Sequence, residues 1–233
     1  IEGERLLAFT NTADPLFMFG AVAVGMFGYP ELGVFIAITH YLAAFTVGIV
    51  FRFYRRKEDP PVAAEERTKG NLLERALAEM RKAYQEDARP LGQLLADAVK
   101  DSVSTLLMIG GFIVLFAVLY QVLEEVGVLR YILPVLEGGL KILGLNPELG
   151  SALVKGFFEI DIGTMAAAKT AGALADRLIV SAAVIAWSGL SVLGQVMSVI
   201  HGTDLRIRPF IIARVLQAFV AGFYTYLLIG MVK

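Results

Sequence analysis

Four stretches of the chain are apolar for long enough to cross a membrane. Residues 102–123 and 178–200 carry no charged side chain, and residues 32–51 and 209–232 carry one ionisable side chain each. Each stretch reaches the roughly 20 residues that span a hydrocarbon core of about 30 Å. The pattern predicts an all-α, polytopic integral membrane protein.

Two further apolar regions are interrupted by polar residues. Residues 4–28 contain a polar run at 11–15, where Pro15 lacks a backbone N–H and disfavours helix in the residue before it. We therefore expect two half-helices, or a discontinuous helix. Residues 127–145 and 147–172 together predict a re-entrant hairpin, which is tolerated at membrane depth only where protein or water surrounds its backbone.

The second arm of this hairpin contains two carboxylates, Glu159 and Asp161. On a continuous helix they would point about 200° apart, so both can face one site only if the helix is broken. We expect Gly163 to ease that break. A charge at bilayer depth costs about 2.5–3.5 kcal/mol or more and survives mostly beside a cavity or a partner. Such breaks are typical of transporter binding sites, although Lys155 could instead neutralise Glu159.

Residues 54–101 are the charged part of the chain. Apolar residues recur there at helical spacing and predict an amphipathic helix that ends near Asp87, before Pro90. The basic residues that precede and open this segment place it in the cytoplasm; they are Arg52, Arg55, Arg56 and Lys57. We interpret it as a solvated cytoplasmic linker, and docking of its helix on the membrane or on the protein stays open.

Sliding the chain by about 172–177 positions reveals a weak internal repeat. Residues 4–7 align with 176–179, and residues 34–37 align with 210–213. Basic residues place the two copies in opposite directions across the membrane. Inverted repeats are characteristic of secondary transporters, which hold the substrate where the repeats meet.

These observations divide the chain into three regions. Residues 1–53 form the first repeat, 54–101 the linker, and 102–233 the second repeat with the hairpin at 127–172. The first residues have neither an initiator Met nor a signal-peptide layout. We therefore expect an upstream segment, or a separate chain, to complete the first repeat.

Composition agrees with a membrane protein and excludes several functions. The chain is 57% hydrophobic and 18% charged, whereas soluble domains have about 45–50% and 25%. A net charge of −1 provides no basic surface for a nucleic acid. The absence of cysteine excludes thiolate chemistry, and two histidines are too few to indicate a metal site. The sequence contains none of the common hydrolase or nucleotide-binding motifs, so we expect no enzymatic activity and no catalytic residues.

Polar side chains at the interruptions are the candidate substrate-binding residues: Thr10, Asn11, Thr12, Glu159, Thr164, Ser188, Ser191 and Gln195. Their hydroxyl, amide and carboxyl groups suit a small polar solute. For Ser188 and Ser191, close helix packing is the alternative role.

A second set of residues concerns ions. Asp14, Glu159 and Asp161 are candidates for coupling transport to Na⁺ or H⁺, with helix capping as the alternative for Asp14. Lys169 and Arg214 could pair with an anionic substrate, but we favour snorkelling to the membrane surface for both. We expect neither a resident metal nor an organic cofactor.

Several motifs resemble the YlbJ family of sporulation integral membrane proteins, which carry a nucleoside-recognition Gate domain and are distantly similar to concentrative nucleoside transporters. The motifs are Phe9-Thr10-Asn11-Thr12-Ala13-Asp14-Pro15-Leu16-Phe17, Gly25-Met26-Phe27-Gly28, His40-Tyr41, Phe157-Phe158-Glu159-Ile160, Gly163-Thr164 and Ala186-Trp187-Ser188-Gly189-Leu190-Ser191. The resemblance covers the whole chain. Asp161 departs from it, because the family pattern has a polar uncharged residue there.

The resemblance implies transport of dipicolinic acid across the outer forespore membrane of a bacterial mother cell. A Gate-domain carrier of nucleosides or another small polar solute, and a non-transporting sporulation scaffold, are the alternatives. The expected partners are the lipid bilayer and a small anionic or nucleoside-like solute. A homodimer stays open.

Overall fold

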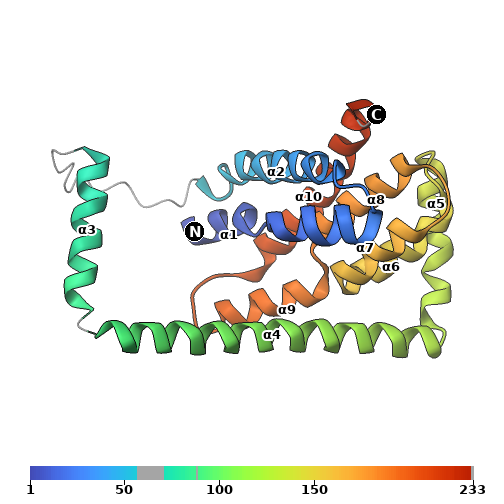
Figure 1. Ribbon diagram of the computed structural model, residues 1–233. Coiled ribbons are helices and arrows are strands. Elements are labelled where there is room, and N and C mark those ends of the chain that lie inside the picture. The colour runs from blue at the N-terminus through green and yellow to red at the C-terminus, as the bar shows by residue number, and fades with distance from the viewer. Residues whose placement is uncertain (57–70, 88, 232–233) are drawn as a thin grey trace. The chain divides into compact units, whose positions relative to one another are not determined.

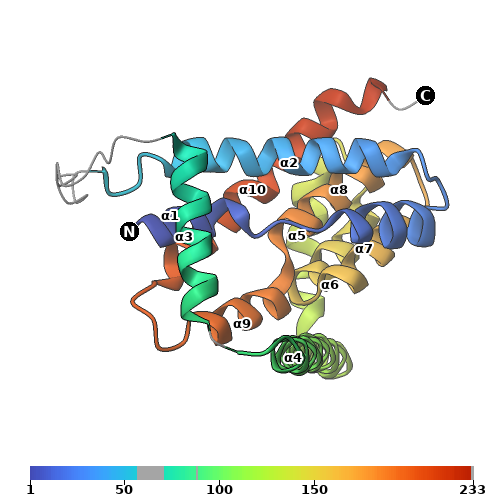
Figure 2. The ribbon, with the colours of Figure 1, turned by 60° about the vertical axis from the view of Figure 1, so that its left-hand side comes forward.

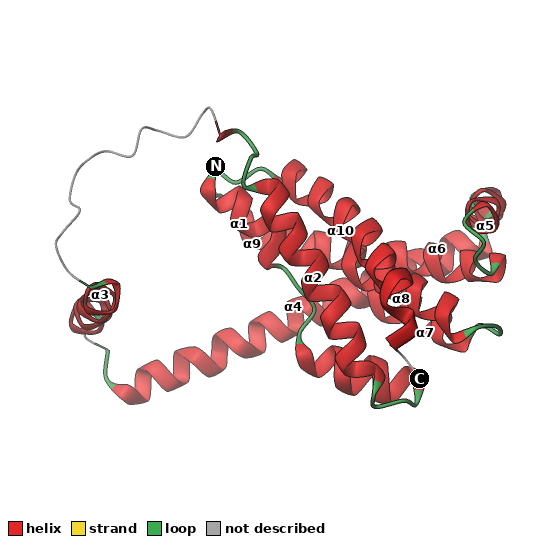
Figure 3. Cartoon of the chain, turned by 90° about the horizontal axis from the view of Figure 1, so that it is seen from above, coloured by secondary structure: helices red, strands yellow, loops and turns green. Residues whose placement is uncertain are grey.

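The computed structural model describes residues 1–56, 71–87 and 89–231, and every element within these ranges is a helix (Figure 3). The all-α prediction is confirmed.

The helices follow one another along the chain with short connections. In order they are α1 (Glu2–Thr10), η1 (Phe17–Phe27), α2 (Leu32–Phe51), α3 (Leu72–Glu86), α4 (Leu91–Glu125), η3 (Val128–Tyr131), α5 (Leu133–Ile142), η4 (Pro147–Leu149), α6 (Gly150–Phe158), α7 (Ile160–Lys169), α8 (Leu174–Trp187), α9 (Gly189–Ile200), α10 (Ile207–Leu228) and η5 (Ile229–Met231). They divide into two compact units, one formed by Ile1–Arg56 with Ile109–Lys233 and the other by Lys57–Met108.

Helix α3 of the smaller unit is the predicted amphipathic helix. The Asn71 side chain accepts a hydrogen bond from the Leu73 backbone nitrogen at its start, and the helix ends before Asp87, as expected. Its apolar side chains Leu73, Leu77, Met80 and Tyr84 are exposed. Residues 57–70 of the predicted linker lie outside the described residues. Residues 91–101 belong to α4, which begins directly after Pro90 and continues into the apolar span.

Within the described residues, four segments are long and apolar enough to cross a membrane: Leu32–Phe51, Leu91–Glu125, Leu174–Ile200 and Ile207–Leu228. They overlap the four stretches that the sequence predicts, so the prediction of four candidate spans is confirmed. The third segment is not one continuous helix, because α8 ends at Trp187 and α9 begins at Gly189.

Small side chains hold the centre of the larger unit together. Helices α2 and α8 pack along α10 (Figures 1 and 2). Their contact contains a cluster of four buried alanines, Ala43, Ala182, Ala186 and Ala221. In lipid, helices associate largely through close packing, and small residues let their backbones approach.

Helices α6 and α7 fold back on each other as a helical hairpin whose tip is Glu159. A Cβ atom at Gly163 would overlap the backbone of Gly156. Seven residues extend about 10.5 Å along a continuous helix, so this contact requires a reversal between the two glycines. The predicted break in this part of the chain is therefore confirmed.

Two details of that prediction were wrong. Gly163 does not form the break; it lies inside α7 and allows the two arms to pack closely. The re-entrant hairpin formed by 127–145 and 147–172 stays a prediction, and in the structure α5 packs against η4 and α6. The glycines at 138–139 had suggested an interruption, but α5 continues through both of them.

The two ends of the larger unit repeat one order of elements. A short helix, an interruption, a second short helix and a long span occur as α1, η1 and α2, and again as α8, α9 and α10. The interruption at 11–14 and the one at Ser188 lie 174–177 positions apart, which matches the offset of the sequence repeat. The inverted orientation of the copies stays a prediction.

Candidate functional site

Glu159 interrupts the chain between α6 and α7 and caps the second helix. Its backbone is extended, with φ −148° and ψ 128°. Its Oε2 accepts hydrogen bonds from the backbone nitrogens of Asp161 at 2.6 Å and Ile162 at 3.0 Å. The first N–H groups of a helix lack partners within it, and the positive end of its dipole attracts a carboxylate. These bonds hold a carboxylate that is only 1% exposed.

The interruption between α8 and α9 lies directly against Glu159. Ser188 and Gly189 both have left-handed backbone, with φ 73° and φ 79°. A Cβ atom at Gly189 would come within 3.1 Å of the Phe158 carbonyl oxygen and 3.2 Å of the Glu159 Cα. Ser191 Oγ donates to Glu159 Oε1 at 3.5 Å. Glycine therefore permits a contact between two helix breaks that are far apart in the sequence.

Trp187 links the interruption at Ser188 to the one at Glu159. Its indole Nε1 donates to the Phe157 carbonyl oxygen at 3.1 Å, and the two rings stack with centroids 5.6 Å apart. The Phe157 carbonyl belongs to the last turn of α6, where no following turn supplies N–H groups to donate to it. The indole therefore satisfies a helix end that the hairpin tip leaves open.

No cation neutralises Glu159 within the part of the chain that the structure describes. The sequence had left open a pair with Lys155, but the Lys155 ammonium lies over the Tyr120 ring, 5.9 Å from its centroid. That interpretation is wrong, because the reversal at Glu159 turns its carboxylate to the α7 backbone and to Ser191. Asp161 is half-buried in the first turn of α7.

The first interruption, between α1 and η1, is held by side chains from other helices. His40 Nε2 accepts a hydrogen bond from the Ala13 nitrogen at 3.1 Å, and the Tyr41 hydroxyl donates to the Ala13 oxygen at 3.1 Å. Asp14 Oδ1 accepts from the Phe17 nitrogen at 2.8 Å, which is the capping contact considered from the sequence. Thr10 is exposed and its hydroxyl bonds back to Leu6 within α1.

Arg214 reaches the same interruption from α10. Nη1 donates to the Asn11 oxygen at 2.5 Å and Nη2 donates to the Ala8 oxygen at 2.6 Å, so the guanidinium caps the end of α1. Its side chain is 1% exposed, and the expectation that it snorkels to the surface is wrong for this residue. Helices α1, α2 and α8 all pack against α10. Lys169 is exposed in the last turn of α7.

The three interruptions flank one hydrophobic cluster. Ala13 in the first interruption, Ile160 beside Glu159, and Ile185 shortly before Ser188 all belong to it or pack against it. Glu159, Ser188 and Ser191 are brought together directly. Thr164 is fully buried near them along α7, and its hydroxyl has no protein partner. The structure records no side-chain hydrogen bond for Thr12 or Gln195, both of which are half-buried.

Sequence reasoning missed Gln217. It is fully buried on α10, one turn after Arg214, and neither atom of its amide has a partner. A single uncharged amide in an apolar span carries no charge signal, unlike Arg214. Gln217 lies three residues after Arg214, and residues at this spacing share a helix face. The position of Arg214 therefore provides a signal for Gln217.

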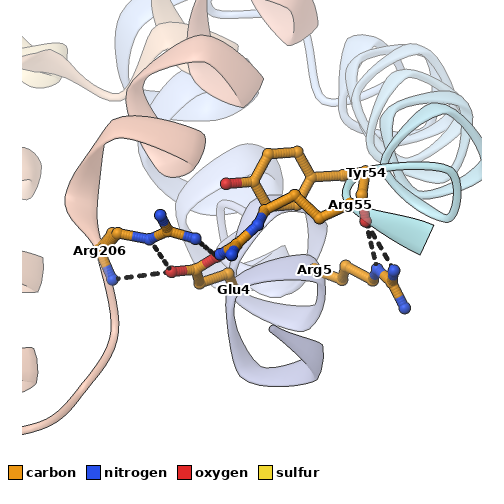
Figure 4. A network of polar contacts seen from close by, with 5 residues as sticks. All are labelled: Glu4, Arg5, Tyr54, Arg55 and Arg206. Atoms are coloured by element: carbon orange, nitrogen blue, oxygen red, sulfur yellow. Dashed lines mark hydrogen bonds and ion pairs between the residues drawn. The ribbon is translucent and has the colours of Figure 1, made fainter. Parts of the chain in front are cut away.

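A network at another end of the molecule fixes α1 against its neighbours (Figure 4). Glu4 is 3% exposed and accepts from Arg206 Nε at 2.8 Å and from Arg206 Nη2 at 3.3 Å. Arg55 Nη1 lies 3.9 Å from the same carboxylate, and Arg5 donates to the Tyr54 oxygen. The sequence did not predict this network, because its members come from three separate parts of the chain: residues 4–5, 54–55 and 206.

An apolar groove in this region lies away from the predicted site residues. A groove of about 450 Å³ between α5, α6, α8 and α10 is lined by apolar side chains such as Leu140, Leu153 and Phe219. None of the predicted site residues lines it. A surface of this composition suits lipid tails rather than a polar solute.

Two comparisons with known proteins find similarities to this chain. Residues 106–203 match the family "Gate: Nucleoside recognition", a range that includes the Glu159 and Ser188 interruptions but neither Asn11 nor Arg214. The chain is 39% identical over 228 residues to sporulation integral membrane protein YlbJ of Bacillus subtilis (strain 168). The chain is thus similar over nearly its whole length to a YlbJ protein and contains a region that matches the Gate model. The family resemblance inferred from the motifs is thus confirmed.

The match to the YlbJ relative covers 98% of this chain and 56% of that protein. The chain therefore spans about half the length of the curated relative. No solved structure matches it. Four apolar spans and an integral membrane relative establish an integral membrane protein.

Proposed function

We propose that this YlbJ relative is a membrane transporter of dipicolinic acid, pyridine-2,6-dicarboxylate, during endospore formation. The observation that supports this most strongly is the buried Glu159 carboxylate, which sits at a hairpin tip against a second helix break. No cation lies within ion-pair distance of it in the described part of the chain. Intramembrane carboxylates are costly, and in transporters they mark the ion or substrate pathway.

In this proposal the substrate binds where the two repeats meet. Residues 1–53 and 102–233 are the repeats, and their relative motion opens the site to either side of the membrane in turn. The repeated order of elements supports this assignment. The membrane is a bacterial cell membrane, the outer forespore membrane in particular, and the linker at 54–101 lies in the cytoplasm.

The carboxylates and the polar donors have separate roles. Like charges repel, so Glu159 and Asp161 are poorly suited to bind a dicarboxylate and are assigned to a coupling ion, Na⁺ or H⁺. The substrate carboxylates instead take hydroxyl, amide and helix N-terminal N–H groups at the interruptions. Ser188, Ser191 and Thr164 supply such hydroxyls on the two broken segments, and the Thr164 hydroxyl has no protein partner.

One observation favours a second candidate, a carrier of nucleosides. The matching family is described as nucleoside recognition. A nucleoside offers both donors and acceptors and could use the Glu159 carboxylate directly. Uptake measurements with both solutes distinguish the two candidates.

The test is uptake of radiolabelled dipicolinate and uridine into proteoliposomes that contain the purified protein. We expect dipicolinate uptake driven by a Na⁺ or H⁺ gradient. We further expect Glu159→Gln and Asn11→Ala to reduce it at least tenfold and the control Thr225→Val to leave it unchanged. Thr225 is buried on α10 and bonds within its own helix. Uridine uptake without dipicolinate uptake would establish the nucleoside carrier, and no flux of either solute would favour a scaffold.

A further inference from the structure

Helix α10 carries two buried polar side chains whose hydrogen-bonding groups lack protein partners. Arg214 is 1% exposed and its Nε has no acceptor; Gln217, one turn later, is fully buried with both amide atoms unpaired. Burying unpaired polar groups is unfavourable, and nearly all such groups in native proteins have a partner. The two side chains therefore indicate a partner that is not part of the protein chain.

The charge balance at Arg214 points to an anion. Within the described residues, no carboxylate lies within ion-pair distance of the guanidinium. Its acceptors are the carbonyl oxygens of Ala8 and Asn11 at the end of α1. A helix C-terminus supplies about half of an elementary negative charge, so positive charge remains in excess.

His40 adds a further donor at the same interruption. Its Nε2 accepts the Ala13 N–H, so the neutral ring carries its proton on Nδ1, and buried Nδ1 has no partner. These three side chains thus have unpaired N–H donors on Arg214, His40 and Gln217. They have one unpaired acceptor, the Gln217 oxygen. A donor-rich, positively charged site matches a ligand that only accepts hydrogen bonds, which describes a carboxylate.

We infer that Arg214, Gln217 and His40 form a carboxylate-binding subsite beside the first helix interruption. This inference rests on the proposed transport function and specifies the class of substrate as a small organic acid. All three side chains are at most 2% exposed, so the subsite is occluded in this conformation. Movement of residues 11–14, which are held by side-chain hydrogen bonds, opens it to a solute.

Gln217→Leu provides the critical test because leucine has a similar size and no polar atoms. Replacing an unpaired buried amide by an apolar group does not lower stability, so the ligand-free variant should melt at or above the wild-type temperature. We expect its affinity for radiolabelled dipicolinate in detergent to fall at least tenfold, with loss of the dipicolinate-induced melting shift. Arg214→Lys should show a similar loss, and Thr225→Val should bind as the wild type does.

The outcomes separate this inference from the transport proposal. Dipicolinate binding by Gln217→Leu within twofold of wild type would overturn the subsite and leave transport standing. A ligand-free Gln217→Leu protein that melts well below both wild type and Thr225→Val would show a structural role for the amide and would likewise overturn the subsite. A wild-type protein that transports no solute would instead overturn the proposed function.

Discussion

Arg214 and Ala8 lie 206 positions apart, yet Arg214 Nη2 donates a 2.6 Å hydrogen bond to the Ala8 carbonyl oxygen. This contact joins the last transmembrane span to the end of the first half-helix. The negative end of the α1 dipole faces a guanidinium, just as the positive end of the α7 dipole faces the Glu159 carboxylate. Each buried charge is thus stabilised by a broken helix rather than by an opposite charge.

The close packing of α6 and α7 predicts that Gly163→Ala is severely destabilising. The added Cβ would overlap the Gly156 backbone, which cannot move aside as a flexible side chain would. Overpacking typically costs about 1–3 kcal/mol and more when backbone is involved. Thermal unfolding in detergent measures the effect.

Gly138→Ala is the matched control for the hairpin. Gly138 lies inside α5 with open space around its Cα, so the change should be neutral or stabilising by up to about 1 kcal/mol. Equal melting temperatures for the Gly163 and Gly138 variants would argue against the close contact of α6 with α7.

Substitutions of Glu159 should separate helix capping from ion coupling. Glu159→Gln keeps one oxygen that can accept from the α7 backbone, so we expect near-wild-type stability with loss of ion-coupled uptake. Glu159→Ala removes the cap as well and should cost about 1 kcal/mol of unfolding free energy. Asp161→Asn is the stability control, because the Asp161 side chain has no capping bond. Full coupled uptake by Glu159→Gln would contradict the assignment.

Trp187 should report solute binding through its fluorescence. It is the single tryptophan of the chain, and it stacks on Phe157 between the two interruptions in contact. A solute that enters there changes the polarity around the indole, so dipicolinate should alter its emission in a saturable way, with excitation at the red edge. Phe157→Leu, which removes the stacking partner, should change the baseline emission. A Trp187 emission spectrum that does not change at saturating dipicolinate would indicate that the solute binds away from Trp187.

The Glu4–Arg206 pair predicts a loss of stability in acid. Glu4 lies outside the four candidate spans, and the hydrogen bond from Arg206 holds the pKa of its carboxyl below the ordinary value of 4.5. A group with a lowered folded-state pKa stabilises the fold fully above its ordinary pKa, and this contribution is lost as the pH falls through the lowered value. Melting temperatures between pH 7 and pH 3 should therefore fall more steeply for wild type than for Glu4→Gln.

Glu2→Gln is the control for this pH dependence, since Glu2 is an exposed glutamate on the same helix. It should retain the wild-type acid sensitivity. Identical pH profiles for wild type and Glu4→Gln would show that the pair contributes little.

The sequence by itself determined the features that depend on local backbone preference and on overall apolarity. Uninterrupted apolar length located the four spans, and Pro15 located the first broken helix. The spacing of apolar residues located α3 and its end before Asp87. The unusual carboxylate at Glu159 marked the second break, since a charge within an apolar run is costly unless the backbone or a cavity accommodates it.

Only the tertiary structure decided which side chains face one another. In lipid, the surface of a helix that packs on protein is about as apolar as the surface that faces the bilayer, so the pattern does not reveal the buried face. The pattern therefore suggested snorkelling for Arg214, gave no sign of Gln217, and did not show that Gly163 packs against Gly156. Those features depend on contacts between segments up to 206 positions apart, which local preferences do not encode.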